Sequence, residues 1–167
     1  KNFIRNQVAV NEGDVYDGKL IPALKNIVES TNEDKFLIIN LMGSHCSFKD
    51  RYPKEFEYFT LADYEDGNLS TDSKQLLAEY DNSILYNDFV VYEILQRFAD
   101  KEAIVLYFSD HGIDVFQSSN DYIGHAKTNN VVSVESARQI PLMVYTTHAF
   151  KEKFPQLESR IKNSTLV

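Results

Sequence analysis

The sequence predicts an α/β fold in which helices cover both faces of a largely parallel sheet. Three short apolar runs, at residues 36–42, 103–108 and 140–147, have the length and composition of buried strands. A long segment at residues 70–100 lies between the first two runs and carries apolar residues at helical spacing. A strand, a helix and a further strand form a right-handed crossover with parallel strands. With helices on both sides, the expected architecture is an α/β/α sandwich.

The remaining predicted elements are helices. Residues 17–30 place leucine, isoleucine and valine at helical intervals, and Asp17 is a candidate N-cap for this segment. A serine, a threonine and an aspartate at residues 70–72 are candidate caps for the long central helix. The C-terminal segment 148–163 is expected to be helical, with a break near Pro155.

Composition limits the classes of function. A net charge of −8 over 167 residues argues against non-specific binding to nucleic acid or to an anionic membrane surface. No apolar run reaches the roughly 18 residues that a membrane-spanning helix needs. A hydrophobic content of 43% is enough for one compact domain over residues 1–167. Because the chain opens on Lys1 rather than methionine, we expect it to be an incomplete piece of a longer protein.

Two polar motifs follow predicted strands. Residues 43–45 (Gly-Ser-His) follow the first strand, and residues 109–112 (Ser-Asp-His-Gly) follow the second. Ligands of open α/β sheets bind at the carboxyl ends of the strands. Asp110 and His111 offer an oxygen and an imidazole, which are ligand types for zinc or manganese, and Gly112 permits the sharp turn or the close backbone approach that such a site needs. Alternatively, Asp110 caps the following segment and His111 packs against the sheet edge.

The distribution of histidines favours a shared site. His45, His111 and His125 all lie in predicted loops at one sheet edge. The polar stretch 109–139 is also long for a simple connection, and long loops on rigid scaffolds often carry function. We therefore expect these three histidines to converge with Asp110 at one edge of the sheet, where Asp110 and His111 lie within reach of a common metal ion.

Four sequence blocks resemble those of the bacterial phosphoethanolamine transferases, which belong to the sulfatase-like branch of the alkaline phosphatase superfamily. The blocks are LMGSHCSFKDRYPKEFEYF, YDNSILYNDFVVYEIL, YFSDHG, and YIGHA followed by IPLMVY, in the order of the family. The resemblance runs from about Asp17 to Thr147, and the combination is much more specific than any single block. It implies an alkaline phosphatase/sulfatase-like fold, of which residues 1–167 are the C-terminal portion of a periplasmic catalytic domain.

The resemblance also implies an activity. Family members are inner-membrane proteins that move phosphoethanolamine from a phospholipid to lipopolysaccharide, at lipid A or a core sugar, or to another envelope glycan. By similarity, Asp110 and His111 bind zinc (one or two ions, with manganese as an alternative), and His45 and His125 bind substrate. The family's nucleophilic threonine, its first metal-binding acid and its membrane helices are expected before Lys1, so no catalytic nucleophile is assigned here.

The sequence departs from the family pattern at two places beside these motifs. Ile113 and Asp114 follow the Ser-Asp-His-Gly motif, where the family often has glutamate next. Cys46 follows the Gly-Ser-His motif, where small residues or proline are common. Neither change removes an implied ligand, but each can alter the rim that selects the acceptor.

Three other functions are consistent with these residues. One is another hydrolase of the superfamily, although Phe48 and Asp50 break the C/S-x-P-x-R motif of sulfatases. Another uses Cys46 as a nucleophile with His45 as base, which is disfavoured because adjacent side chains rarely face one point and a lone cysteine usually packs as a small hydrophobe. The last is a non-catalytic domain that binds metal or glycan. If the chain is part of a phosphoethanolamine transferase, residues 1–167 alone are expected to be inactive.

Overall fold

The computed structural model describes residues 16–30, 33–64, 68–120, 122–125, 135–136 and 138–164. The chain divides into two compact units. The first unit consists of Lys1–Thr60 and Glu79–Arg97, and the second consists of Leu61–Ala78 and Phe98–Val167. The long helix α2 (Thr71–Gln96) contributes residues to both units. No helix in these described ranges has both the length and the apolar character needed to cross a bilayer.

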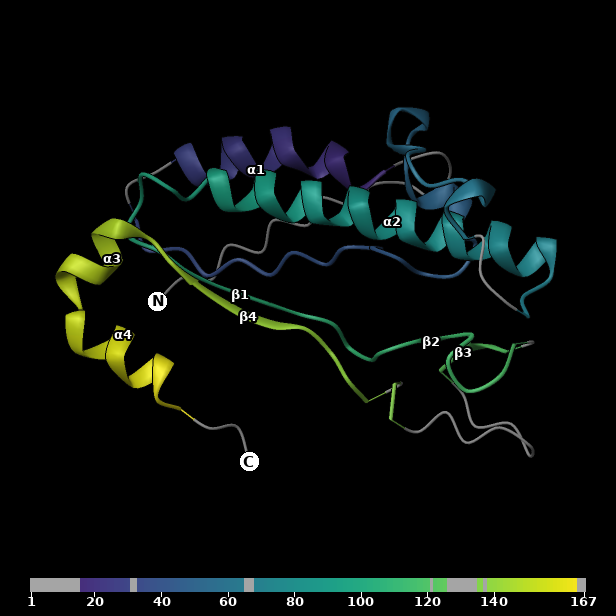
Figure 1. Ribbon diagram of the computed structural model, residues 1–167. Helices are drawn as coiled ribbons and strands as arrows, with labels where there is room; N and C mark the ends of the chain where they lie inside the picture. The colour runs from purple at the N-terminus through teal and green to yellow at the C-terminus, as the bar shows by residue number, and fades with distance from the viewer. Residues whose placement is uncertain are drawn as a thin grey trace. The chain divides into compact units, whose positions relative to one another are not determined.

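The first unit is mainly helical. Its elements besides α2 are η1 (Asp17–Lys19), α1 (Leu20–Glu29), η2 (Phe48–Arg51) and η3 (Lys54–Phe56) (Figure 1). The helix expected at residues 17–30 is confirmed. The prediction that Asp17 caps it is wrong, because α1 begins after Lys19 and its N-cap makes no side-chain hydrogen bond.

Aromatic rings from α2 hold the first unit together. Tyr86 makes edge-to-face contacts with Phe56 at 4.8 Å and with Tyr16 at 5.9 Å between ring centroids. Phe48 meets Tyr80 in the same manner at 5.1 Å. Such pairs stabilise a fold by about 0.5–1.5 kcal/mol beyond the area they bury. The rings therefore fix η2 and η3, and the loops joined to them, against α2.

A buried asparagine connects a loop of this unit to α2. Asn82 is 1% exposed, and its Oδ1 accepts the N–H groups of Tyr58 at 2.8 Å and Phe59 at 2.7 Å. Its Nδ2 donates to the Phe59 carbonyl at 2.9 Å. Burial costs little when both ends of an amide are hydrogen-bonded in this way. Asn82 therefore serves as a fixed attachment point for the chain after η3.

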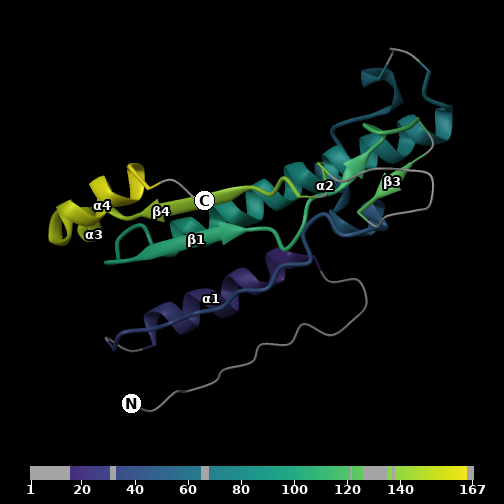
Figure 2. The same ribbon diagram turned by 90° about the horizontal axis from the view of Figure 1, so that it is seen from below.

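The second unit contains two small antiparallel sheets. Strand β1 (Ile104–Phe108) pairs with β4 (Leu142–Thr146) in a register that sets Leu106 opposite Val144. Figure 2 shows these two strands side by side with opposite arrows. The shorter β2 (Asp114–Val115) pairs with β3 (Ile123–Gly124). The remaining elements of this unit are η4 (Leu61–Asp63), α3 (His148–Lys153) and α4 (Pro155–Lys162).

The structure confirms part of the predicted sheet. The runs at 103–108 and 140–147 form β1 and β4, and the C-terminal helix breaks before Pro155 as expected. The strand expected at 36–42 is not formed, because no described segment pairs with its backbone. Both sheets of the described residues are antiparallel, so the predicted parallel sheet is not confirmed.

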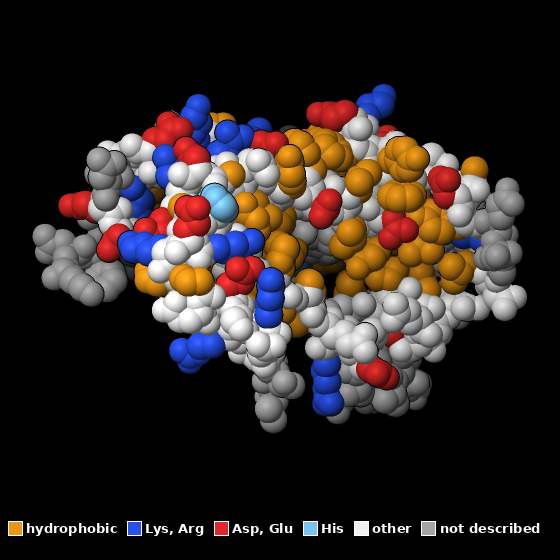
Figure 3. Space-filling model, turned by 60° about the vertical axis from the view of Figure 1, so that its left-hand side comes forward, with side chains coloured by type: hydrophobic (Ala, Val, Ile, Leu, Met, Phe, Trp, Pro, Cys, Tyr) orange, Lys and Arg blue, Asp and Glu red, His pale blue; other side chains and the backbone are white. Residues whose placement is uncertain are grey.

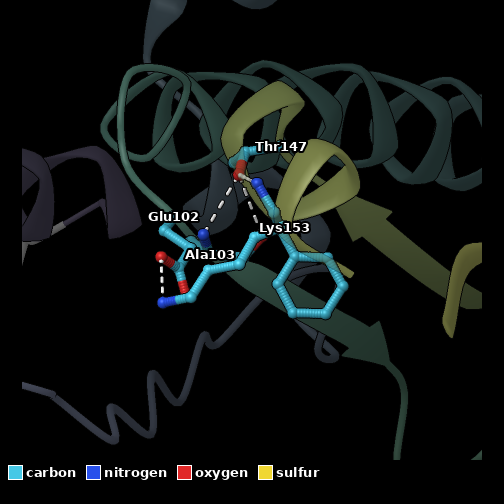
Figure 4. Close-up of polar contacts among 5 residues, drawn as sticks. Glu102, Ala103, Thr147 and Lys153 are labelled. Atoms are coloured by element: carbon cyan, nitrogen blue, oxygen red, sulfur yellow. Dashed lines mark hydrogen bonds and ion pairs between the residues drawn. The ribbon is translucent and has the colours of Figure 1, made fainter. Parts of the chain in front are cut away.

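Thr147 joins the start of β1 to the end of β4 (Figure 4). This residue is 1% exposed, and its hydroxyl accepts the Ala103 N–H at 3.0 Å and the Phe150 N–H at 3.3 Å. The same hydroxyl donates to the Ala103 carbonyl at 3.2 Å. Nearby, Lys153 forms an ion pair with Glu102 at 2.8 Å. Since that pair is exposed to solvent, it contributes at most about 1 kcal/mol, and Thr147 is the main connection.

Hydrophobic side chains remain on the surface, and patches of them are visible in Figure 3. Exposure alternates along β1 and β4, so one face of this strand pair is more open than the other. The exposed face consists of Ile104, Leu106, Phe108, Leu142 and Val144, with Phe108 61% exposed. Exposure also alternates along residues 36–42, where Phe36 is 84% exposed.

Candidate functional site

The turn after β1 carries the predicted metal ligands. The Ser109 hydroxyl donates to the His111 carbonyl at 2.7 Å, and the His111 N–H donates to Asp110 Oδ1 at 3.0 Å. These bonds fold the chain back as soon as the strand ends. Because the Ser109 hydroxyl donates its hydrogen bond to a backbone carbonyl, it has a structural role here rather than that of an activated nucleophile.

Gly112 allows another segment to approach this turn closely. A Cβ atom at this position would lie 2.5 Å from the carbonyl oxygen of Gln139 and closer still to that of Ser136. Backbone atoms cannot yield to such a contact as a flexible side chain can. The prediction that Gly112 permits close backbone approach is therefore confirmed.

The side chains of Asp110 and His111 are placed so that both can reach one metal ion. His111 Nε2 and Asp110 Oδ1 lie 3.8 Å apart. Zinc bonds to nitrogen and oxygen are each about 2.0–2.2 Å long, so a single ion can lie within bonding distance of both atoms. The described residues contain no group of three or more His, Cys, Asp or Glu side chains that could hold a metal. This pair therefore fits part of a zinc shell.

The tautomer of His111 also suits metal binding. Its Nδ1 lies 2.8 Å from the carbonyl oxygen of Gly112. A carbonyl oxygen can only accept a hydrogen bond, so Nδ1 must carry the proton. In the neutral ring the lone pair is then on Nε2, the atom nearest Asp110. Histidine ligands of metals are commonly oriented by a bond of this kind from the other nitrogen.

His125 lies against His111. The two rings are stacked with centroids 3.9 Å apart and planes inclined by 30°. His125 follows β3 directly, and Gly124 before it has a φ of 152°, which L side chains rarely adopt. The short β2–β3 pairing thus returns the chain to the turn after β1. The structure brings together Asp110, His111 and His125, three of the four residues expected to converge.

Asp114 organises this hairpin, a role that the sequence analysis missed. Its side chain is fully buried, and Oδ1 accepts the N–H groups of Gln117 at 2.8 Å and Ser118 at 3.3 Å. The Ser118 hydroxyl makes a further short hydrogen bond to Oδ2. The available indication was an aspartate followed three and four residues later by polar residues, a pattern typical of side chains that bind their own turn.

His45 belongs to the first unit, and the structure describes its loop there. Gly43 has a φ of 54°, in the left-handed region that favours glycine, and the His45 N–H donates to the Met42 carbonyl at 3.3 Å. Ser44 Oγ is buried and has no hydrogen-bond partner among the described residues. The loop therefore has a defined turn conformation with His45 exposed at its end.

Cys46 differs from its prediction. Its thiol sulfur lies 3.2 Å from His45 Nδ1, so these two adjacent side chains do meet, an arrangement that was expected to be rare. Cys46 is also exposed, whereas a packed hydrophobe was expected. The reason is local: Ser47 adopts a left-handed φ of 63°, and Arg51 binds the Cys46 carbonyl through Nε at 3.3 Å and Nη2 at 3.1 Å.

Asp17 connects this loop to the start of α1. One carboxylate oxygen accepts the Met42 N–H at 3.1 Å, and the other accepts the Gly43 N–H at 2.8 Å. Sequence reasoning considered this residue only as a helix cap. Its actual partners are 25 and 26 residues away, and no local pattern indicates a contact over that separation.

The family model described as Sulfatase matches residues 1–166. The chain belongs to the sulfatase family. This membership confirms the resemblance seen in the sequence motifs.

Three curated relatives of this sulfatase-family chain are phosphoethanolamine transferases by name. EptA of Helicobacter pylori is 31% identical over 87% of the chain, and EptC of Escherichia coli strain RS218 is 26% identical over 93%. The Kdo(2)-lipid A phosphoethanolamine 7''-transferase of Salmonella typhimurium is 29% identical over 81%. The chain spans only 28%, 27% and 23% of these three proteins, in that order.

Solved structures agree on the fold. The crystal structure of the C-terminal periplasmic domain of EptC from Escherichia coli matches with a TM-score of 0.76 and 26% identity, covering 86% of this chain and 41% of that one. A structure of the same domain in complex with zinc matches with a TM-score of 0.74 and 23% identity, covering 90% and 42%. The sulfatase family member described here therefore has the sulfatase-like fold of the alkaline phosphatase superfamily.

Proposed function

We propose that this chain is the C-terminal portion of the periplasmic catalytic domain of an inner-membrane phosphoethanolamine transferase. The donor is a phospholipid. The acceptor is lipopolysaccharide, at lipid A or a core sugar, or another envelope glycan. The names of the relatives support both the transferred group and a lipid A acceptor. The chain spans about a quarter of the curated relatives' length, which leaves room for the nucleophile and the anchor elsewhere in the protein.

The observation that carries the proposal is the arrangement of Asp110, His111 and His125. A carboxylate oxygen and an unprotonated Nε2 lie 3.8 Å apart, with a second imidazole stacked on the first. This set offers two ligands to one cation and an N–H donor beside it. Phosphoryl transfer requires such positive charge and donors around the phosphate oxygens. In a protein of net charge −8, they must be supplied locally.

Each residue has a distinct proposed role. Asp110 and His111 hold zinc, as one or two ions with manganese as an alternative, together with an acid and a threonine outside this chain. The ion supplies Lewis-acid stabilisation of negative charge on the reacting oxygens. His111 keeps its proton on Nδ1, bonded to the Gly112 carbonyl, and so presents Nε2 as a ligand. His125 and His45 donate hydrogen bonds to the phosphoryl oxygens.

We further propose that the two units belong to one α/β/α domain with a largely parallel sheet. The open face of the β1–β4 pair supports a larger sheet assembly, because a soluble protein rarely leaves a contiguous apolar strand face in water. The alternation of exposed and half-buried residues at 36–42 has the period of a strand, although none of the described residues pairs with it.

Replacing the ligands in the whole enzyme tests the proposal. We expect Asp110→Ala and His111→Ala each to weaken zinc binding by more than about 100-fold, since losing even an outer-shell partner costs up to that much. Zinc content is measured by elemental analysis, and phosphoethanolamine transfer from lipid vesicles is measured on the same preparations. His148→Ala is the matched control, because His148 is 84% exposed and pairs with Glu152 on α3. Full zinc occupancy and turnover in a double variant would contradict the assignment.

The same assay separates the competing functions. A hydrolase of the superfamily releases free phosphoethanolamine without modifying a glycan, and a binding domain retains zinc without turnover. The contact between Cys46 and His45 makes the cysteine mechanism worth a direct test. We expect Cys46→Ser to keep transfer activity, because the proposed nucleophile is a threonine outside this chain. We also expect residues 1–167 alone to show no transfer.

A further inference from the structure

We propose that Asp17 is a positioning residue that fixes the turn carrying His45 and thereby sets the rate of phosphoryl transfer. The proposal rests on the function proposed above, in which His45 binds the transferred group. Asp17 itself touches neither metal nor substrate. It acts through the backbone two and three residues before His45.

The contact is bidentate and charge-assisted. The two oxygens of the Asp17 carboxylate separately accept the N–H groups of Met42 at 3.1 Å and Gly43 at 2.8 Å. Hydrogen bonds to an ionised carboxylate are about twice as strong as those between neutral groups. Two successive backbone donors therefore have their directions set by one rigid, planar acceptor, which fixes the orientation of the peptide group between them.

The turn needs this external support. Gly43 has a left-handed φ of 54°, and Ser47 has one of 63° despite its side chain. The hydrogen bond that closes the turn, from the His45 N–H to the Met42 carbonyl, is long at 3.3 Å. Ser47, two residues beyond His45, has a left-handed φ that is costly for a residue with a side chain, and the bond that closes the turn is weak, so this segment is not in the preferred conformation of a free chain. The Asp17 carboxylate adds two shorter bonds at the residues where the turn begins.

Asp17 is itself held on a rigid base. The N–H of the next residue, Gly18, donates to the hydroxyl of Tyr86 at 3.0 Å. A Cβ at Gly18 would lie 2.5 Å from that hydroxyl oxygen, so the glycine permits the contact. Tyr86 is 6% exposed and packs against Phe56 and Tyr16. Tyr86 of α2 therefore holds Gly18 in place, and the adjacent Asp17 in turn holds the turn that carries His45.

The support that Asp17 gives to this turn matters for catalysis because the rate depends on the position of the His45 side chain. A displacement of about 1 Å in a group that acts on the transition state can cost about 100-fold in rate. His45 is an exposed side chain on a loop, so its own packing does not hold it in place. Precision must then come from the backbone that carries it, and the Asp17 carboxylate accepts two N–H groups of that backbone.

Two measurements on the whole enzyme test the inference. The first is amide hydrogen exchange at Met42 and Gly43, which reports the contact without relying on activity. The second is steady-state kinetics with phosphoethanolamine-bearing lipid vesicles. In Asp17→Ala we expect exchange at both amides to rise at least tenfold and kcat to fall about 10- to 100-fold, with KM changed less than threefold. In Asp17→Asn, both the amide exchange rates and kcat should lie between those of the wild type and of Asp17→Ala, because the asparagine amide retains one acceptor oxygen. Asp50→Ala, which removes an exposed carboxylate from nearby η2, is the matched control and should resemble the wild type.

A double variant separates positioning from general stability. If Asp17 acts through His45, then adding Asp17→Ala to His45→Ala should lower kcat by less than about twofold more. A full multiplicative loss in that background, or unchanged kcat with freely exchanging amides, would overturn the inference. If Asp17→Ala does not fold, the milder Asp17→Asn carries the same comparison.

If the wild-type enzyme transfers no phosphoethanolamine, the proposed function fails. The rate role of Asp17 then fails with it, while amide exchange still decides whether the contact holds the turn.

Discussion

Single polar side chains fix the backbone of this protein where its regular elements end. Asn82, Asp114 and Thr147 are each 0–1% exposed, and each binds at least two backbone groups. Because a buried donor without a partner costs about 1–3 kcal/mol, losing any of these side chains costs more than one ordinary hydrogen bond. Asp17 does the same for the His45 turn from a more exposed position.

Three tyrosines, two buried and one half-buried, make the stability of the first unit sensitive to alkaline pH. Burial raises the pKa of Tyr52, Tyr80 and Tyr86 above the ordinary 10.0, and in Tyr86 the Gly18 N–H opposes this rise while the Asp17 carboxylate adds to it. As the pH rises past 10, these phenols lose protons in the unfolded chain before they do so in the folded one. Their contribution to stability is therefore complete below pH 10 and is lost as the pH rises through the folded-state pKa values.

We expect the free energy of unfolding of the whole protein to fall as the pH rises above about 10, as measured by urea denaturation with tyrosinate absorbance recorded in parallel. Tyr80→Phe, which removes one ionisable group, should make the fall shallower. Tyr58→Phe is the control, because Tyr58 is 73% exposed and should not alter the slope. An identical slope in Tyr80→Phe would contradict the explanation.

Individual residues differed in how well sequence reasoning could place them. The glycine in Ser-Asp-His-Gly and the histidine in Gly-His-Ala were identifiable because each stands in a short motif beside a predicted strand end. Asp17 was not, because its partners come from a distant segment. The contact between Cys46 and His45 also depends on backbone conformation, namely the left-handed Ser47 beside them, which no side-chain pattern specifies.

At the scale of elements, a single threonine connects β1, β4 and α3. Thr147 bonds both the N–H and the carbonyl of Ala103 and caps α3 through the Phe150 N–H. Sequence periodicity identified all three elements, because apolar runs and helical spacing are local properties. It could not identify which strands pair or in which direction, because pairing depends on partners far along the chain. This is why β1 and β4 were found while their antiparallel pairing was not predicted.

Thr147→Val should therefore destabilise the protein by about 2–4 kcal/mol, combining a lost helix cap with an unsatisfied buried donor. The shape of the side chain is retained, so the loss is due to hydrogen bonding. Chemical denaturation with an unchanged m-value measures the effect. Thr146→Val, one residue earlier in β4, is the matched control and should stay within about 0.5 kcal/mol of the wild type. Equal losses in the two variants would assign the effect to packing instead.

At the scale of the whole molecule, exposed apolar surface is the main liability of residues 1–167 as a separate chain. The open face of the β1–β4 pair places Leu106, Phe108 and Leu142 at 45–61% exposure. Contiguous apolar surface of this kind drives association in water. Charge offers only partial protection, because a net charge of −8 is spread over the whole sequence.

The isolated chain is expected to self-associate at micromolar concentrations, and Leu106→Lys should shift it towards monomer in sedimentation experiments. A lysine at this position adds a charge to the exposed face of the strand. Burying that face against apolar surface of another molecule then becomes unfavourable. Gln156→Lys adds the same charge at an exposed position in α4 and should have no such effect. If both variants behave alike, the cause is total charge rather than the strand face.

The solitary cysteine offers spectroscopic access to the proposed centre. Cys46 is the one thiol in 167 residues, it is exposed, and its sulfur lies 3.2 Å from His45 Nδ1. A nitroxide label can therefore be attached beside His45 without first engineering other thiols away. Paired with paramagnetic Mn²⁺ bound at Asp110 and His111, such a label turns the separation of the two histidine-bearing loops into a distance readable by electron spin resonance.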